Sequence, residues 1–527
     1  MAPIFCNRCG DAVEEGCDPR DELAELDALL ERLRLKRYDL KRKINRLHSP
    51  IVRQLPPDVM STIFEFYLPD FTDHILLPYY IKENLSIPLS LGAICSYWRD
   101  IAWSTPSLWS SLVVRVSSKR DSHIATGVVA KEWLDRSGQL PLSICIFSIS
   151  NSYNKTITTL ADIITQYSTR WSDLHLCIPD SYYQSFHATD NHAPILKTIR
   201  FQSSSYEMMN LNLNFHLTCP RLETAFLSFF PVDGSNIQWD NLTHLTLHFM
   251  SITDSFLILR NTPRLVFCIV SGAFLQYREP NVGSTGALVL TSLRSLQLLI
   301  RNFVDNFLSN IVAPCLEEFS LPKYYIPSES MIPSESMEVI TSFLKRSACS
   351  LRSFSMIFPP RFERVTMDLL ESMHSLNTLS IISVTAPSCL ANTTLEDYDP
   401  RYILQLVAKV LSSQSTSLQQ GFLPNLKILE YIGELYLRPG NYGDLYSLPP
   451  ADNVVHGPLH LIKFDLLPAT RIPKNMISYI SSLAERGVTV NVSSGSKDIL
   501  QSSIDYYRCK EDLSPDWTDN LDSSLFS

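Results

Sequence analysis

The sequence predicts an α/β protein in which N-terminal helices precede a long, horseshoe-shaped repeat solenoid whose units each contain a strand. The chain has 527 residues, which at ~100–200 residues per domain indicates more than one domain or an extended repeat array. A heptad pattern near the N-terminus predicts a long helix. Short apolar runs then recur from residue 140 onward, at intervals typical of structural repeats.

Composition and motif content argue against several function classes. The chain has only 16 glycines and contains no G-x-x-x-x-G-K-[ST], G-x-G-x-x-G, G-x-S-x-G or H-E-x-x-H motif, so an enzyme is the unfavoured class. A net charge of −9 provides no field for nucleic acid. The sequence shows no signal-peptide pattern, no apolar run of transmembrane length and mostly scattered cysteines. We therefore expect a cytoplasmic or nuclear protein without a nucleic-acid or membrane partner.

Residues 1–20 are expected to form a flexible leader. They contain Cys6, Cys9 and Cys17, which resemble half of a zinc site. A closed structural zinc site needs four ligands, and the next candidate, His48, lies across a predicted helix. No metal and no other cofactor is therefore expected.

Residues 21–48 are predicted to form an amphipathic helix of the coiled-coil type. Arg37 occupies one slot of its heptad seam, and the other slots are apolar: Leu23, Leu26, Leu30, Leu33, Leu40, Ile44 and Leu47. Acidic residues dominate 14–31 and basic residues dominate 32–46. This order suits antiparallel pairing of two copies, whereas parallel pairing stacks like charges. A homodimer through this helix and a helix folded onto the rest of the chain both fit the pattern.

Residues 50–114 are predicted to form a compact block of three short helices, interrupted by a proline-containing insertion at 69–88, and 115–142 to form a linker helix. A block of this size cannot bury all of its large apolar side chains, among them Ile63, Phe64, Leu91, Trp98 and Trp109. We expect an apolar patch that is open to a partner.

The stretch SPIVRQLPPDVMSTIFEFYLP, followed by LSLGAICSYWRDIAWSTPSLWSSLVV, resembles an F-box. The segment WLDRSGQLPL at Trp133–Leu142 and the leucine-rich helix before the box extend the resemblance to a group of fungal F-box proteins with irregular leucine-rich repeats. The matching residues are Leu55, Pro56, Asp58, Val59, Ile63, Phe64, Leu91, Cys95, Trp98, Arg99, Ile101, Ala102 and Trp109. The insertion at 69–88 departs from the pattern, because it is longer than the usual loop of the box.

The resemblance implies a non-enzymatic substrate-recognition subunit of an SCF-type (cullin-RING) ubiquitin ligase. Its partners are then a Skp-type adaptor, a cullin and an unknown target protein. By the resemblance, the adaptor-binding residues are Leu55, Pro56, Pro57, Val59, Ile63, Phe64, Leu91, Cys95 and Trp98, of which Trp98 fits the core of the box equally well. The alternative is a non-catalytic scaffold that uses the coiled coil and the repeats without ubiquitination.

Residues 143–495 are predicted to form an irregular leucine-rich-repeat solenoid, followed by an acidic tail at 496–527. Aligning the chain on L-x-x-L-x-L gives eleven units, most of them 20–28 residues apart, which begin at Trp171, Leu196, Leu222, Leu242, Leu265, Leu293, Leu316, Leu351, Leu376, Leu426 and Leu461. The leucines should point inward and the intervening residues should line a concave, target-binding face. Candidate target contacts on that face are Arg200, Phe226, His244, His248, Phe267 and Glu430. Arginine occurs once among the face positions, which predicts recognition without phosphate.

Overall fold

The fold is that of an α/β protein with one large, mostly parallel sheet, so the predicted class is confirmed. The structure, a computed structural model, describes residues 4–5, 12–13, 19–48, 55–68, 87–116, 123–148, 154–187, 192–203, 215–230, 232, 234–272, 287–299, 304–321, 334–357, 363–382, 406–407, 409–410, 422–433, 458–466, 472, 474–485, 487–494 and 497–512. The chain divides into two compact units. Unit 1 comprises Met1–Ile178 and Ser185–Ile195, and unit 2 comprises Pro179–Gln184 and Leu196–Ser527.

Unit 1 begins with a long helix and a helical block. The helix is α1 (Pro19–His48), which confirms the helix predicted at 21–48. The block contains α3 (Pro57–Glu65), α4 (Ile87–Ile94), α5 (Ser96–Ser104) and the 3-10 turn η1 (Pro106–Trp109). A two-residue pairing, β1 (Ile4–Phe5) with β2 (Ala12–Val13), precedes α1.

The second part of unit 1 alternates strands and helices. In chain order it contains β3 (Ser111–Val116), α6 (His123–Arg136), β4 (Leu142–Ser148), α7 (Lys155–Ile164), η2 (Thr165–Arg170) and β5 (Trp171–Ile178). The three strands pair in parallel in the order β3-β4-β5. The parallel strands therefore start at Ser111, earlier than the predicted start of the repeats at 143.

The WLDRSGQLPL segment connects the helical block to these strands through buried aromatic rings. Trp133 donates a hydrogen bond through Nε1 to the Ser111 carbonyl at 3.1 Å and packs edge-on against Trp109, with the ring centroids 4.7 Å apart. Trp109 is buried and donates to the Ala102 carbonyl at 2.7 Å. The Arg136 guanidinium lies 4.9 Å from the Trp109 ring centroid. These contacts make Trp109 part of the core.

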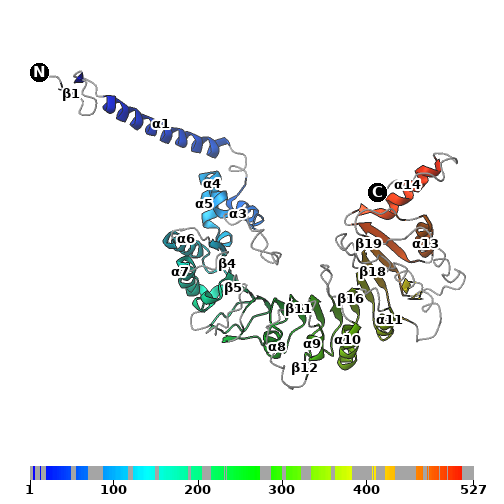
Figure 1. The fold of residues 1–527 in the computed structure, drawn as a ribbon. Helices are drawn as coiled ribbons and strands as arrows, with labels where there is room; N and C mark the ends of the chain where they lie inside the picture. The colour runs from blue at the N-terminus through cyan, green and yellow to red at the C-terminus, as the bar shows by residue number, and fades with distance from the viewer. Residues whose placement is uncertain are drawn as a thin grey trace. The chain divides into compact units, whose positions relative to one another are not determined.

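Unit 2 contains a sheet in the order β6-β8-β10-β11-β13-β15-β16-β17-β18-β19-β20-β21 (Figure 1), in which all neighbours are parallel except β20 and β21. The strands of unit 2 are β6 (Thr198–Ser203), β7 (Phe215–Leu217), β8 (Thr224–Ser228), β9 (Ser235–Ile237), β10 (His244–His248), β11 (Phe267–Ser271), β12 (Leu288–Val289), β13 (Ser295–Leu299), β14 (Ile311–Val312), β15 (Glu318–Ser320), β16 (Ser353–Ile357), β17 (Thr378–Ile382), β18 (Ile428–Gly433), β19 (Leu461–Leu466), β20 (Thr489–Ser494) and β21 (Lys497–Asp498). The helices are α8 (Ile252–Arg260), α9 (Val304–Ser309), α10 (Ser334–Ser347), α11 (Glu363–Glu371), α13 (Lys474–Glu485) and α14 (Ile499–Asp512). A short 3-10 helix, η3 (Asp180–Ser185), follows β5.

Burial along the strands follows the predicted repeat. In β10, Leu245 and Leu247 are buried, while His244, Thr246 and His248 alternate with them and are exposed or half-buried. The same alternation occurs in β11 and, apart from the buried Ser228 at its end, in β8, and both strands pair with β10 in register. Helices α8, α9, α10 and α11 lie on one side of the sheet (Figure 1). The buried Phe319 of β15 packs against the buried Phe343 of α10, with the ring centroids 5.8 Å apart, so the buried side chains point toward the helices. Ten of the eleven predicted first positions are buried, and the exception is Leu461.

The exception results from a two-residue shift in the last aligned unit. Leu461 pairs with Ile428, which lies two places after the first leucine of its own unit, Leu426. The first position of the β19 unit is therefore the buried Leu459. Because side chains alternate every two residues along a strand, the shift leaves Lys463 and Asp465 on the predicted face.

Polar side chains join neighbouring units at the residue that precedes the first leucine. Asn241 donates through Nδ2 to the Pro220 carbonyl at 2.7 Å, and Asn425 donates in the same way to the His374 carbonyl at 2.8 Å. Ser292 donates through Oγ to the Pro263 carbonyl at 3.0 Å. In each case the acceptor belongs to the preceding unit, two residues before its first leucine. These bonds satisfy turn carbonyls and help to hold successive units in register.

The C-terminal segment is more structured than the predicted acidic tail at 496–527. Residues 497–512 form β21 and α14, and β21 pairs antiparallel with β20. Ser503 of α14 is buried and accepts a hydrogen bond from the Ile472 backbone at 3.1 Å. The predicted leader cysteines Cys6, Cys9 and Cys17, and most of the insertion at 69–88, lie outside the described residues.

Candidate functional site

The first candidate surface is on α3, a short helix whose N-terminus is determined by local sequence signals. Pro56 holds the extended N-cap position, Pro57 follows it, and Asp58 places a carboxylate in the first turn, where it suits the helix dipole. Met60 and Phe64 are one turn apart and fully buried. They anchor α3 to the rest of the block and determine which face of the helix remains outside.

The outer face of α3 carries an apolar stripe. Val59 is 40% exposed and Ile63, one turn later, is 37% exposed. Phe66 and Tyr67 follow at the next turn, and Phe66 is 85% exposed. Positions three and four residues apart lie on one side of a helix, so these four side chains form a continuous stripe. A large apolar stripe of this kind is typical of a surface that a partner protein covers.

Inside the block, two of the predicted adaptor contacts are core residues. Phe64 is fully buried, and its ring packs against Trp98 with the centroids 5.0 Å apart. Leu91 of α4 is also buried. Neither side chain is available for direct contact with a partner in this conformation. Their place in the core follows from the packing of α3 and α4 against α5.

The remaining predicted adaptor residues lie at or near the surface of the block. Pro56 and Pro57 are exposed, and Leu55, Cys95 and Trp98 are half-buried. Cys95 is the N-cap of α5, where its Sγ accepts from the Trp98 backbone at 3.5 Å, and the Tyr97 hydroxyl donates to the Leu55 carbonyl at 3.4 Å. Phe66, Tyr67, Leu89 and Ile94, which were not among the predicted contacts, are also exposed apolar side chains of the block.

The second candidate surface is the face of the unit 2 sheet opposite the helices, here called the open face. In β6 to β11 it is formed by Thr198, Arg200, Gln202, Thr224, Phe226, Ser228, His244, Thr246, His248, Phe267, Ile269 and Ser271. All six predicted target contacts have some exposure: His244 is exposed, and Arg200, Phe226, His248, Phe267 and Glu430 are half-buried. The structure therefore places all six predicted target contacts on the same side of the sheet.

Histidines and phenylalanines interlock on β8, β10 and β11. The His248 ring stacks on Phe226 with the centroids 6.1 Å apart, and His244 lies 5.8 Å from Phe267. His248 also shares a hydrogen bond with the Ser228 hydroxyl at 3.1 Å. Burial lowers the pKa of His248, which favours the neutral imidazole at physiological pH. This part of the open face is therefore aromatic, and burial favours a neutral His248 within it.

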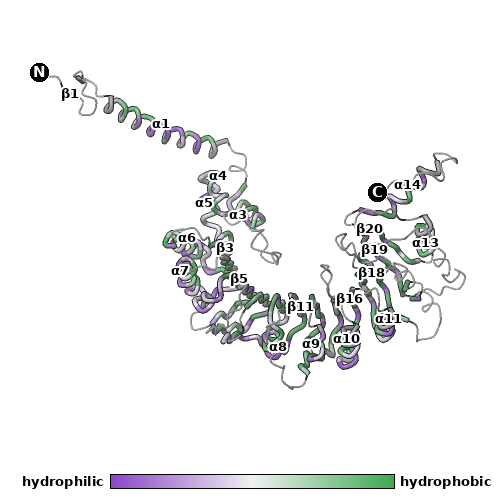
Figure 2. Tube along the Cα trace, in the orientation of Figure 1, coloured by the Kyte–Doolittle hydropathy of each residue, from purple (hydrophilic) through white to green (hydrophobic). Residues whose placement is uncertain are grey.

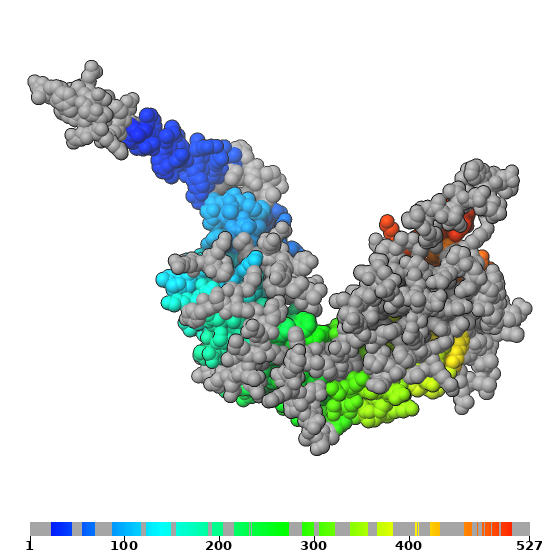
Figure 3. All heavy atoms as spheres, in the orientation of Figure 1, coloured from blue at the N-terminus to red at the C-terminus, as the bar shows by residue number. Residues whose placement is uncertain are grey.

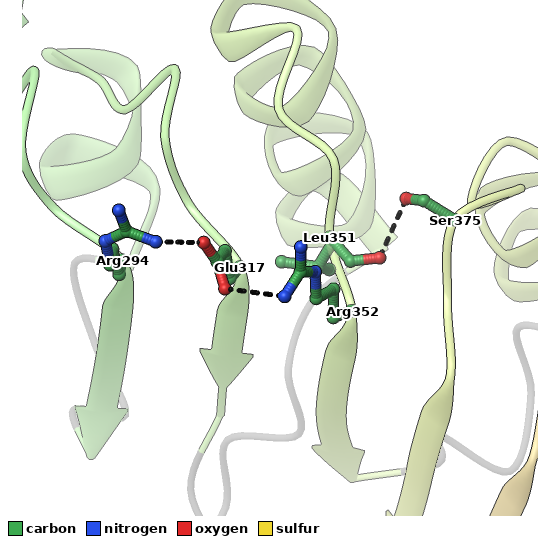
Figure 4. A network of polar contacts seen from close by, with 5 residues as sticks. All are labelled: Arg294, Glu317, Leu351, Arg352 and Ser375. Carbon is green, nitrogen blue, oxygen red and sulfur yellow. Dashed lines mark hydrogen bonds and ion pairs between the residues drawn. The ribbon is translucent and has the colours of Figure 1, made fainter.

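Several charged residues elsewhere in unit 2 are paired with one another. Lys463 donates to the Glu430 carboxylate at 2.8 Å across β19 and β18. At the starts of neighbouring strands, Glu317 bridges Arg294 and Arg352, the second at 3.4 Å (Figure 4). Pairing reduces the net charge that these groups present to a ligand, and their partial exposure limits their effect on stability.

Within the described ranges no group of three or more His, Cys, Asp or Glu residues could hold a metal ion. Burial raises the pKa of Cys268 and of Cys219 to about 12 and that of Cys177 to about 11, so these thiols stay protonated at neutral pH. The histidines of β10, His244 and His248, instead bond to Thr243 and Ser228.

Comparisons with known proteins give little guidance. No family model and no curated protein matches the chain. Among solved structures, the chain is similar to a Bacteroides fragilis protein determined by a structural genomics consortium, at 12% identity and a TM-score of 0.28, over 58% of this chain and 70% of that one. No helix in the described part of the chain is long and apolar enough to cross a membrane.

Proposed function

We propose that the protein is a substrate-recognition subunit of an SCF-type ubiquitin ligase. The helical block of residues 50–114 acts as an F-box that binds a Skp-type adaptor. The sheet and helices of unit 2 act as a leucine-rich-repeat solenoid that binds a target protein on the open face. Catalysis then belongs to other subunits, and this chain raises the local concentration of target lysines at the transferring enzyme.

The observation that carries the proposal is the apolar stripe of α3. Val59, Ile63, Phe66 and Tyr67 remain exposed while Met60 and Phe64 of the same helix are fully buried. A helix of nine residues with apolar side chains on both faces suits a position between two protein layers. The alternation along the strands of unit 2 supports the solenoid part of the proposal.

The core assignments refine which residues should contact the adaptor. The outer stripe and the exposed Pro56, Pro57, Leu89 and Ile94 are the direct contacts. Phe64 and Leu91 act indirectly, because they hold α3 and α4 in position. Substitution of Phe64 is therefore a poor test of adaptor binding, since it would disturb the block itself.

The test is co-purification of the adaptor and the cullin with the full-length protein. Combining Pro56→Ala with Ile63→Asp should reduce adaptor recovery by at least about tenfold, because a carboxylate is placed in an apolar interface. Val128→Asp is the matched control: it introduces the same charge at an exposed apolar residue of α6, outside the helical block, and should preserve binding. Circular dichroism should show that both variants are folded.

Two results would contradict the proposal. If the intact protein recovers neither adaptor nor cullin, the protein functions instead as a non-catalytic scaffold. If the Pro56→Ala/Ile63→Asp variant recovers the adaptor as well as the intact protein does, the α3 stripe is not the contact surface.

A further inference from the structure

Helix α1 has an apolar seam that remains uncovered in the single chain. The six seam residues from Leu23 to Ile44 whose side chains are described and apolar are between 51% and 59% exposed. Every other described side chain of α1, from Leu23 to Ile44, is exposed as well. Hydrophobic and hydrophilic residues alternate along the helix (Figure 2), and its side chains are exposed along its length (Figure 3). A helix of 30 residues with this much exposed leucine gains stability by pairing.

The seam follows the heptad a and d positions. Leu23, Leu30, Arg37 and Ile44 occupy a, and Leu26, Leu33, Leu40 and Leu47 occupy d. Two antiparallel copies can align all eight positions, with each a residue opposite a d residue of the other copy. Leu23 then faces Leu47, Leu26 faces Ile44, Leu30 faces Leu40 and Leu33 faces Arg37. A shift of one heptad in either direction removes two of these layers, so the length of the seam selects one register.

The charges select the antiparallel orientation. In this register the flanking Asp27 of one copy lies beside Lys41 of the second copy, and the contact occurs twice by symmetry. In a parallel pair the flanking neighbours are Glu22 with Asp27 and Lys36 with Lys41, which repel each other. Near the middle of the helix, Arg34 and Lys36 each lie beside the same residue of the second copy, and the pairing of Arg34 with Glu31 of its own chain at 3.5 Å reduces the first of these two repulsions. The antiparallel pair therefore has two attractive and two repulsive flanking contacts, whereas all four charged contacts of the parallel pair are repulsive.

The contact that α1 makes with the helical block leaves this seam free. Arg42 donates through Nε to the Ser96 hydroxyl of α5 at 3.2 Å. Arg42 occupies heptad position f, on the side of the helix opposite the a and d residues. The block and a second copy of α1 therefore use different faces of the helix.

We propose that α1 is a dimerisation element through which two copies of the chain pair as an antiparallel coiled coil. The two-fold axis passes between the helices at the level of Leu35, whose own side chain lies on the outer face. Dimerisation does not involve the α3 stripe, so the dimer can be confirmed or excluded independently of adaptor binding.

Sedimentation velocity of the full-length protein over a concentration series tests the dimer. The intact protein should sediment as a dimer, and Leu30→Asp/Leu33→Asp should sediment as a monomer because two carboxylates enter the seam. The control, Ala28→Asp/Leu35→Asp, adds the same charges at f positions of the same helix and should remain dimeric. A monomeric intact protein, or equal dimerisation of the two variants, would overturn the proposal.

Charge reversal tests the orientation. Asp27→Lys or Lys41→Asp alone should raise the dimer dissociation constant by about tenfold, since two attractive contacts become repulsive. The combined Asp27→Lys/Lys41→Asp variant should restore the affinity of the intact protein. In a parallel dimer each single reversal would instead remove a repulsion and tighten the pair, and that result would overturn the antiparallel arrangement.

Discussion

At the residue scale, three neighbouring units share a left-handed backbone position directly after the strand. Phe229 and Phe249 adopt φ values of 50° and 49°, and Gly272 adopts 59° at the equivalent place after β11. The Phe229 and Phe249 rings stack with their centroids 4.9 Å apart. A Cβ on Gly272 would lie 2.5 Å from the Phe249 ring. Gly272 therefore permits the left-handed backbone conformation and leaves room for the Phe249 ring.

Substitution of this glycine should destabilise unit 2 through the clash with Phe249. We expect Gly272→Ala to cost about 1–3 kcal/mol, because it combines backbone strain with overpacking. Adding Phe249→Ala removes the ring, so the double variant should lose about 1 kcal/mol less than the two single variants together. Urea denaturation of the three variants measures this coupling. If the losses of the two single variants simply add in the double variant, the clash with the Phe249 ring does not cause the destabilisation by Gly272→Ala.

Individual adaptor residues could be predicted from the sequence only in part. Val59, Met60, Ile63, Phe64, Phe66 and Tyr67 form one continuous apolar arc on α3, so helical spacing alone does not show which of them face inward. The packing of α3 against α5 decides it: Phe64, like Leu91 of α4, was predicted as an adaptor contact and is buried in this structure. Phe66 and Tyr67, which were not among the predicted contacts, are exposed.

At the element scale, β19 shows how a repeat can be recognised while its register is misassigned. The segment from Leu459 to Leu466 fits L-x-x-L-x-L from either Leu459 or Leu461. Both registers place the same residues on the same side of the strand. Only the pairing with β18 distinguishes them, and a pairing between segments about 30 residues apart is a tertiary property.

The register predicts unequal costs for two leucines of similar appearance. Leu459→Ala should destabilise unit 2 by about 2–4 kcal/mol, because it leaves a cavity at a buried first position. Leu461→Ala removes a half-buried side chain and should cost less than about half as much. Thermal melts of the two variants provide the comparison. If Leu461→Ala destabilises unit 2 more than Leu459→Ala does, the unit begins at Leu461 instead.

At the scale of the whole molecule, periodicity made most of the fold predictable. Buried leucines recur at regular intervals because each unit repeats one local arrangement, and ten of eleven first positions were assigned correctly. The start of the parallel strands at Ser111 and the structured segment at 497–512 were not predicted, because neither follows the repeat. The function is harder to predict from the sequence than the fold, since changes of side chains on the open face can change what it binds without changing the fold.

The charge distribution of the open face predicts how a target is recognised. Its β6 to β11 part combines aromatic rings with Arg200 as the single arginine, and phosphate recognition normally uses clustered arginines. We therefore expect the full-length protein to bind unphosphorylated peptides on an array at least as well as their phosphorylated versions. A consistent preference for the phosphorylated versions would contradict this expectation.

The antiparallel strand at the end of the unit 2 sheet has a consequence for solubility. A parallel array leaves a row of unpaired backbone groups on its last strand, and such an edge can recruit a strand from another molecule. Here β21 pairs with the end of β20, and α14 follows it directly, with Ser503 bonded to the backbone of Ile472. The C-terminal segment thus protects the sheet against edge-to-edge aggregation, as terminal capping repeats do in repeat proteins.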